Sequence, residues 1–257
     1  MLLNCNFRSA VLRRNAQITV ILPTPEEENA PMPQDLKVLY LLHGLHGDET
    51  SWVRYTNVER YAQQAGIAVV MPGVGNSFYQ DMVHGERFFT FMTQELPRFI
   101  QGLFPVSKKR EDTYIAGLSM GGYGAFFLGL SCPQLYSAAA SFSGAVDIAF
   151  NATPLQLPEG APIPFFAEDC FGDITQMKGS HRDIIALYEK ADPASLPRLY
   201  QSCGTADYLF GMNKLFHKKM TELGAQICWR ETPGMAHEWD FWDAEVRYLL
   251  NTWLKEL

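Results

Sequence analysis

The segment that most constrains this chain surrounds Ser119 and reads Ile-Ala-Gly-Leu-Ser-Met-Gly-Gly-Tyr-Gly-Ala over residues 115–125. It contains a Gly-x-Ser-x-Gly pentapeptide that follows a β-branched and aromatic run and precedes a run of small residues. Because Gly117 and Gly121 lack Cβ atoms, a strand and a helix can approach closely on either side of the serine. The segment therefore predicts a nucleophile elbow, a sharp strand-turn-helix unit that presents the Ser119 hydroxyl for attack.

The same segment supplies a stabilising environment for negative charge. A helix that begins at Met120 would direct its first backbone N–H groups, with their partial positive charge, toward the place where an oxyanion develops. The alternative is a glycine-rich turn that only packs. A strand before the serine and a helix after it favour catalysis.

Apolar runs alternate with helical patterns along the rest of the chain. The expected strands are Leu2–Leu12, Ala16–Leu22, Lys37–Leu42, Ile67–Met71, Thr113–Gly117, Ser137–Phe142, Arg198–Cys203 and Gln226–Glu231. The expected helices are Trp52–Gln64, Arg87–Phe104 with a kink or break at Pro97, Met120–Leu130, Phe210–Leu223 and Trp239–Leu254. Nearly continuous apolar runs fit strands that are covered on both faces. The order predicts an α/β fold with a mostly parallel central sheet and helices on both faces.

The length of 257 residues favours one domain, residues 1–257, because α/β folds of this size routinely form a single unit. Residues 23–35 are rich in Pro and Glu and are expected to form an exposed hairpin loop. Residues 147–196 interrupt the alternation as a long, Pro-rich insertion before the strand at Arg198–Cys203. Such insertions are often lids or substrate-binding excursions, and a plain surface loop is the alternative.

A serine nucleophile needs a histidine to accept its proton and a carboxylate to orient that histidine. In the fold that carries this elbow, the chain order is serine, acid, histidine. Five histidines fit poorly because they precede the serine, lie in the insertion or lie within a helical stretch: His43, His46, His84, His181 and His217. His237 remains as the candidate base, in a turn between the last strand and the last helix.

The candidate acid is Asp207, which follows the strand Arg198–Cys203 in the sequence Cys-Gly-Thr-Ala-Asp-Tyr. Residues that face ligands gather at the carboxyl ends of parallel strands. An N-cap for the following helix is the alternative role for Asp207. Asp147, after the preceding strand, is the second candidate for the acid.

The second half of the oxyanion hole is expected in the loop after Lys37–Leu42, which reads His-Gly-Leu-His-Gly. The N–H groups of Leu45 and Met120 are the predicted donors, and Gly44 is less favoured than Leu45. The two histidines of this loop are three residues apart and lack a third ligand at a suitable spacing. The spacing therefore disfavours a metal site in this loop.

Composition limits the partners. The net charge of −7 disfavours nucleic acid and anionic membranes as partners, and a small neutral substrate is easier to accommodate. The five cysteines are odd in number and widely spaced, as expected for reduced thiols. Neither a signal peptide nor an apolar run of membrane-spanning length is apparent, so a cytoplasmic location is expected.

Several ordered motifs carry a family resemblance: YLLHGLHGDETSW, TNVER, VVMPG, IAGLSMGGYGA, ASFSGA, CGTADYL and HEWDFW. With them the chain resembles the putative-esterase, or esterase D-like, family of α/β-hydrolases, and is most similar to its tributyrin and feruloyl esterase branch. The resemblance implies Ser119, Asp207 and His237 as a catalytic triad, with Leu45 and Met120 as oxyanion donors. It also implies carboxylesterase activity without metal or cofactor, and frequent homo-oligomers.

Substrate preference is less constrained. The expected substrates are short-chain acyl esters or hydroxycinnamoyl (feruloyl-type) esters, and an S-formylglutathione hydrolase-like thioesterase is the alternative. Thioesterases of that kind typically carry histidine where this chain has Tyr123. Four aromatic residues are expected near the pocket, either as ring-stacking partners for an aromatic acyl group or as core: Trp52, Phe78, Tyr79 and Phe165.

Overall fold

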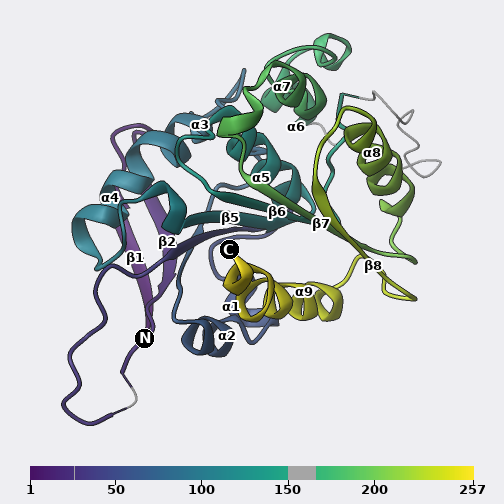
Figure 1. The fold of residues 1–257 in the computed structure, drawn as a ribbon. Helices are drawn as coiled ribbons and strands as arrows, with labels where there is room; N and C mark the ends of the chain where they lie inside the picture. Colours follow the sequence, from purple (N-terminus) through teal and green to yellow (C-terminus); the bar gives the residue numbers. More distant parts are fainter. Residues whose placement is uncertain (26, 150–165) are drawn as a thin grey trace.

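The computed structural model describes residues 1–25, 27–149 and 166–257 (Figure 1). Eight strands form one sheet in the order β1-β2-β4-β3-β5-β6-β7-β8. Their bounds are β1 Leu2–Arg8, β2 Asn15–Ile21, β3 Val38–Leu42, β4 Ala68–Pro72, β5 Thr113–Leu118, β6 Ala138–Phe142, β7 Arg198–Gly204 and β8 Ile227–Thr232. Strand β2 pairs antiparallel with β1 and β4, and β3 to β8 run parallel. The predicted mostly parallel sheet is confirmed.

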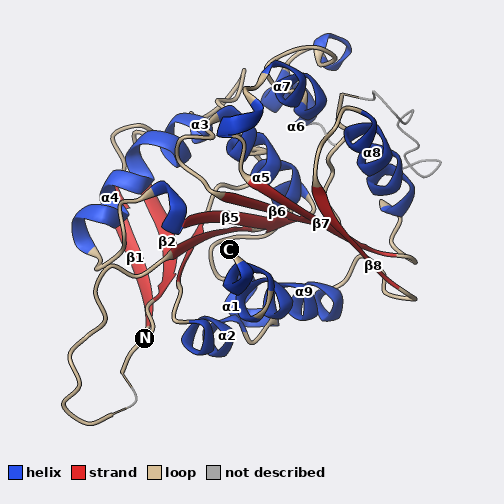
Figure 2. Ribbon diagram, in the orientation of Figure 1, coloured by secondary structure: helices blue, strands red, loops and turns tan. Residues whose placement is uncertain are grey.

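Helices cover both faces of this sheet (Figure 2). One face carries α1 (Ser51–Tyr55), α2 (Val58–Ala65) and α9 (Trp239–Asn251). The other carries α4 (Leu96–Leu103), α5 (Met120–Ser131), α7 (Ile184–Lys190) and α8 (Phe210–Glu222). Successive residues of β3 point into two separate apolar clusters, which is why its sequence is apolar at every position. Helix α5 is apolar on all sides because it is enclosed by β5, β6 and α7.

The parallel direction of β3 to β8 places all of their carboxyl ends along one edge of the sheet. The loops that follow β3, β4, β5, β7 and β8 therefore meet at that edge. Open α/β sheets bind their ligands at this edge.

Two helix predictions need correction. The single helix predicted at Trp52–Gln64 is two helices, because Thr56 is extended (φ −138°, ψ 173°) between α1 and α2. The predicted break at Pro97 is absent, since α3 (Phe88–Thr90), a π-helical turn at Phe91–Glu95 and α4 follow one another without interruption. Pro97 lies just after the π-helical turn, and the backbone stays helical through it.

The hairpin predicted at residues 23–35 is also wrong. Strand β2 pairs with β1 and β4 but not with β3. The connection from β2 to β3 therefore passes β4 and is not a hairpin. No local pattern in this loop distinguishes the two possibilities, because the choice is made by the sheet order.

The stretch at 147–196 contains regular structure where the structure describes it. It includes α6 (Phe166–Phe171) and α7, separated by a 3₁₀ turn at Ile174–Gln176. Residues 150–165, and with them Phe165, lie outside the described residues. Among the helices that the structure describes, none is long and apolar enough to cross a membrane.

Candidate active site

Ser119 occupies the tight turn between β5 and α5 in a strained backbone conformation. Its φ of 53° and ψ of −116° are unusual for a residue with a side chain, and such a conformation costs about 1–3 kcal/mol. Its N–H donates to the Phe142 carbonyl at 2.9 Å, and its own carbonyl accepts from the N–H groups of Gly122, Tyr123 and Ala145 at 3.0–3.1 Å. These bonds to α5 and to the end of β6 hold the strained serine in place.

The glycines around Ser119 are required by close backbone approaches. A Cβ on Gly117 would lie 2.4 Å from the Gly121 carbonyl oxygen, and one on Gly121 would lie 2.5 Å from the Leu42 carbonyl oxygen. Helix α5 therefore packs directly against the ends of β5 and β3. The sequence prediction that these glycines permit a close strand-helix approach is confirmed.

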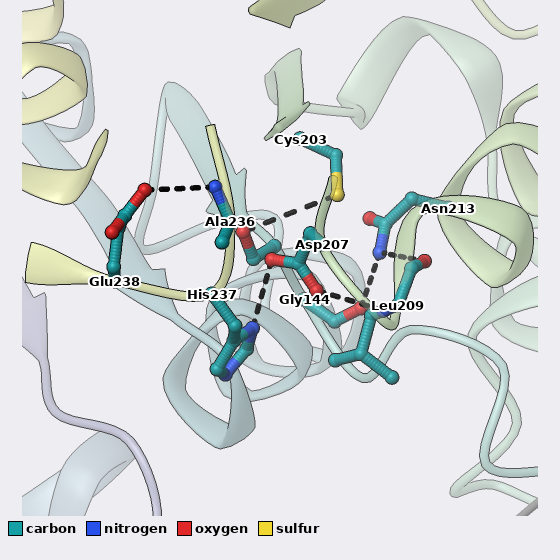
Figure 3. A network of polar contacts seen from close by, with 9 residues as sticks. Gly144, Cys203, Asp207, Leu209, Asn213, Ala236, His237 and Glu238 are labelled. Carbon is teal, nitrogen blue, oxygen red and sulfur yellow. Dashed lines mark hydrogen bonds and ion pairs between the residues drawn. The ribbon is translucent and has the colours of Figure 1, made fainter. Parts of the chain in front are cut away.

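Asp207 and His237 form the central hydrogen bond of the site (Figure 3). His237 Nδ1 lies 2.8 Å from Asp207 Oδ2, and the second carboxylate oxygen accepts from the Leu209 N–H at 2.7 Å. The Asp207 side chain is fully buried, whereas 16% of the His237 side chain is exposed. Because an ionised carboxylate only accepts, Nδ1 carries the proton and Nε2 is left free to act as a base.

The loops that carry this pair are bonded to each other. The Ala206 N–H donates to the Met235 carbonyl at 3.0 Å, and the Gly234 N–H donates to Thr205 Oγ1 at 2.9 Å. A Cβ on Gly204 would lie 2.1 Å from the Met235 carbonyl oxygen, so the two loops touch through backbone. The separation of Asp207 from His237 is thereby set by main-chain contacts.

Two aromatic rings surround the His237 imidazole. The Tyr208 ring lies 4.6 Å from it, and the Trp242 ring contacts it edge-on at 4.9 Å. Neither residue was identified as a site residue from the sequence. The signal was their position directly beside the candidate acid and in the HEWDFW motif.

Ser119, Asp207 and His237 follow β5, β7 and β8 and lie at the same edge of the sheet. The hydrogen bonds among the described residues join Asp207 to His237 but do not join His237 to Ser119. Asp147, the second candidate for the acid, is buried beyond the end of β6.

The loop after β3 lies beside the serine. A Cβ on Gly44 would be 3.3 Å from the Ser119 Cβ. Within the described parts of the chain, no hydrogen bond uses the N–H of Leu45 or of Met120. Two backbone donors next to Ser119 are therefore available to a ligand.

The aromatic residues expected near the pocket are largely core. Trp52 and Tyr79 are fully buried, and each donates a hydrogen bond to a backbone carbonyl, that of Leu42 at 3.1 Å and that of His43 at 2.9 Å. Neither ring is accessible for stacking on a ligand in this structure. Phe78 is 8% exposed and packs on Tyr123 and Phe171.

A cavity of about 400 Å³ opens next to the loop after β3. Its walls include Leu45, the Arg54 and Tyr55 side chains of α1, and Trp239 at the start of α9. The Tyr55 and Trp239 rings lie 4.9 Å apart, and Tyr55 is 54% exposed. This aromatic pair is not apparent from the sequence, because its members lie 184 positions apart in the chain.

The histidine at the end of β3 has a structural role. Its Nδ1 lies 2.7 Å from the Gly44 carbonyl oxygen, and Nε2 accepts from the Val74 N–H at 3.2 Å. Burial lowers the pKa of His43, so the ring is neutral and Nδ1 is the donor. No three His, Cys, Asp or Glu side chains within the described ranges form a group that could hold a metal ion.

The chain is similar to known esterases and serine hydrolases. The family model described as "Putative esterase" matches residues 9–246. An acetyl esterase of Caldicellulosiruptor saccharolyticus is 31% identical over all of this chain and 98% of its own length. Among solved structures, the fluorophosphonate-binding serine hydrolase F of Staphylococcus aureus, with substrate bound, is 30% identical with a TM-score of 0.86, covering 98% of this chain and 97% of that one. An S-formylglutathione hydrolase of Staphylococcus aureus is also 30% identical, with a TM-score of 0.84 over the same shares.

Proposed function

Because this chain belongs to the putative-esterase family and is a carboxylic ester hydrolase, we propose that Ser119, His237 and Asp207 hydrolyse short-chain acyl esters through an acyl-enzyme. The hydrogen bond between His237 and Asp207 carries this proposal. It fixes the imidazole tautomer in which Nε2 can accept a proton from a hydroxyl group.

In the first half of the reaction, His237 Nε2 takes the proton of the Ser119 hydroxyl while Oγ attacks the ester carbonyl carbon. His237 comes within hydrogen-bond reach of Ser119 when substrate is bound. The resulting imidazolium is stabilised by the Asp207 carboxylate. It then gives its proton to the leaving alcohol oxygen as the tetrahedral intermediate collapses, which leaves an acyl group on Oγ.

The negative charge of the intermediate needs donors that are not already used. The N–H groups of Leu45 and Met120 meet this requirement, and Met120 is also the first residue of α5. Alignment of the α5 peptide dipoles adds positive potential at that end. Loss of one oxyanion donor costs about 100-fold to 1000-fold in turnover in comparable sites.

In the second half, water replaces the alcohol. His237 removes a proton from the water as its oxygen attacks the acyl carbonyl, and the same two N–H groups hold the second oxyanion. His237 then gives this proton to Ser119 Oγ as the bond between Oγ and the acyl carbon breaks, which releases the carboxylic acid and restores the site.

Short acyl groups are supported by the acetyl esterase relative at 31% identity. The cavity beside Leu45 is suited to the alcohol part of the ester. Its walls include Leu45 of the loop after β3 (residues 43–47, here called the oxyanion loop) and Trp239, which is two residues from His237. Tyr55 and Trp239 give it an aromatic wall, while Arg54 gives it a cation. Hydroxycinnamoyl esters are the second acyl class to test.

Thioester hydrolysis is a second candidate because the S-formylglutathione hydrolase neighbour is 30% identical. Tyr123 stands where such enzymes typically carry histidine, and its ring is buried. Oxygen esters are therefore the favoured substrates.

The test compares p-nitrophenyl acetate, p-nitrophenyl butyrate, methyl ferulate and S-formylglutathione as substrates. The wild type is expected to give its highest kcat/KM on acetate or butyrate, and Ser119→Ala is expected to abolish turnover of every active substrate. Equal rates for wild type and Ser119→Ala would refute the serine mechanism. A preference for S-formylglutathione would refute the assigned substrate class but leave the serine mechanism intact.

A further inference from the structure

The oxyanion loop is a tight turn with a strained residue next to the proposed donor. The Gly47 N–H donates to the Gly44 carbonyl at 3.2 Å and closes a four-residue turn with Leu45 and His46 at its centre. His46 has a φ of 63°, in the left-handed region that favours glycine. A residue with a side chain holds that conformation only when its surroundings impose it.

Residues 74–79, which follow β4, support this conformation of His46 through a hydrogen bond. His46 donates its backbone N–H to Asn76 Oδ1 at 2.8 Å. The same segment holds His43, through the Val74 N–H on its ring and the Tyr79 hydroxyl on its carbonyl. Both flanks of Leu45 are thus bonded to residues 74–79, which limits rotation of the Leu45 N–H.

Residues 74–79 are held by contacts of their own. Phe78 and Tyr79 have φ values of 50° and 59°, and the turn is closed by the Tyr79 N–H on Ser77 Oγ at 3.1 Å. The Tyr79 ring also packs on α5, where a Cβ on Gly124 would lie 2.4 Å from it. Residues 74–79 therefore contact both the loop that contains Leu45 and the helix α5 that begins at Met120. These are the two residues whose N–H groups are the proposed oxyanion donors.

We propose that Asn76 is a positioning residue for the oxyanion hole, holding the turn at His46 so that the Leu45 N–H faces the developing oxyanion. This inference rests on the proposed serine mechanism. Three hydrogen bonds between residues 74–79 and the loop are described above. The one that Asn76 Oδ1 accepts can be removed with least damage to the fold. Asn76 is half-buried and uses a side-chain acceptor, whereas Tyr79 is fully buried.

Asn76 also connects the loop to the insertion. Its backbone carbonyl accepts a hydrogen bond from Cys170 Sγ of α6 at 3.2 Å. A substitution of the Asn76 side chain leaves this backbone contact available. A substitution at Asn76 can therefore separate the effect of its side-chain hydrogen bond to His46 from that of its backbone contact with α6.

The experiment measures kcat and KM for p-nitrophenyl acetate in Asn76→Ala, with Asn6→Ala on the exposed face of β1 as the matched control. Asn76→Ala is expected to lower kcat about 10-fold to 100-fold, part of the loss seen when an oxyanion donor is removed. Its KM is expected to stay within about 3-fold, because a donor that acts on the intermediate contributes mainly to kcat. Asn6→Ala is expected to match the wild type.

A second variant keeps the proposal falsifiable if Asn76→Ala loosens the fold. Glycine adopts the φ of His46 without strain, so His46→Gly in the Asn76→Ala background is expected to recover at least about 5-fold in kcat. An Asn76→Ala enzyme with wild-type kcat, or a loss confined to KM, would overturn the positioning role. An absence of recovery in the double variant would overturn it too. If Ser119→Ala were as active as the wild type, the proposed function itself would fail.

Discussion

The Tyr123 hydroxyl donates a hydrogen bond to the Arg182 carbonyl at 2.8 Å and so ties the helix behind the nucleophile to the segment that leads into α7. The same hydroxyl accepts from Gln80 Nε2 at 3.1 Å. The Tyr123 ring stacks on Phe127 and meets Phe171 edge-on. Tyr123 therefore contributes to the packing of α6 and of the segment before α7 against α5.

Removing this hydroxyl should destabilise the fold. Tyr123→Phe removes a hydrogen-bond partner from the half-buried Arg182 carbonyl and from the buried Gln80 amide, so we expect a loss of about 1–3 kcal/mol in the free energy of unfolding. Urea denaturation measures it. Tyr208→Phe is the control, since Tyr208 is 71% exposed and its change should stay within about 0.5 kcal/mol. Equal stabilities of the two variants would contradict the structural role of Tyr123.

Asp207→Asn should impair catalysis without unfolding the protein. An amide at this position no longer fixes the His237 tautomer or stabilises its cation, so kcat is expected to fall about 10⁴-fold. The matched substitution is Asp147→Asn, at the other acid considered from the sequence, which should lower kcat less than about 10-fold. Steady-state kinetics on p-nitrophenyl acetate compares them, and a larger loss in Asp147→Asn would reassign the acid.

Substitution of Gly121 in α5 by alanine should destabilise the fold, whereas the same substitution at Gly102 in α4 should not. In Gly121→Ala the new Cβ meets the Leu42 and His43 carbonyl oxygens at 2.5 and 2.7 Å, and we expect a loss of about 3 kcal/mol or more. In Gly102→Ala nothing lies within 4 Å of the new Cβ, and the substitution in α4 should stabilise by about 0.5–1 kcal/mol. Thermal and urea unfolding test both. Similar effects at the two sites would show that the close approach is wrong.

Glu245 should make stability depend on pH. This fully buried carboxyl accepts from the Tyr200 hydroxyl at 2.6 Å and lies 3.4 Å from Arg230, and burial raises its pKa above 4.5. An acid with a raised pKa contributes its stability below the unfolded value and loses it as the pH rises through the folded value. The melting temperature of Glu245→Gln relative to wild type is therefore expected to rise between pH 4 and pH 7. A difference that is constant with pH would refute this.

The Tyr55 side chain should affect substrates with large alcohol groups. If the cavity of Tyr55 and Trp239 binds the alcohol part, Tyr55→Ala should raise KM for 4-methylumbelliferyl acetate about 2-fold to 10-fold, as lost aromatic contacts do. For ethyl acetate, whose alcohol is too small to reach the rings, KM should stay within about 2-fold. Equal changes for both esters would place the alcohol elsewhere.

The elements predicted best from the sequence were those whose signals are local. The β-branched run before Ser119, the glycines around it and the fully apolar strands are dictated by contacts within a few residues, and the structure has them where expected. Which strands neighbour one another is a property of the whole sheet, so the local sequence at residues 23–35 predicts a hairpin that the structure does not contain.

For the candidate site, chain order selected Asp207 and His237, and the structure joins them by a hydrogen bond. The expected pocket residues fared differently. The sequence alone does not distinguish an aromatic residue of the core from one that lines a binding pocket. Trp52 and Tyr79 belong to the core. The Tyr55–Trp239 pair forms only when α1 and α9 pack together.

The connection from β2 to β3 leaves the sheet at the edge opposite the candidate site. Because β2 runs antiparallel to β4, Ile21 ends beside Val69, near the amino ends of the parallel strands, and Val38 starts β3 at the same edge. Asn29, within this connection, is exposed. An anchoring peptide inserted there would attach the protein to a solid support with its substrate entrance facing the bulk solution.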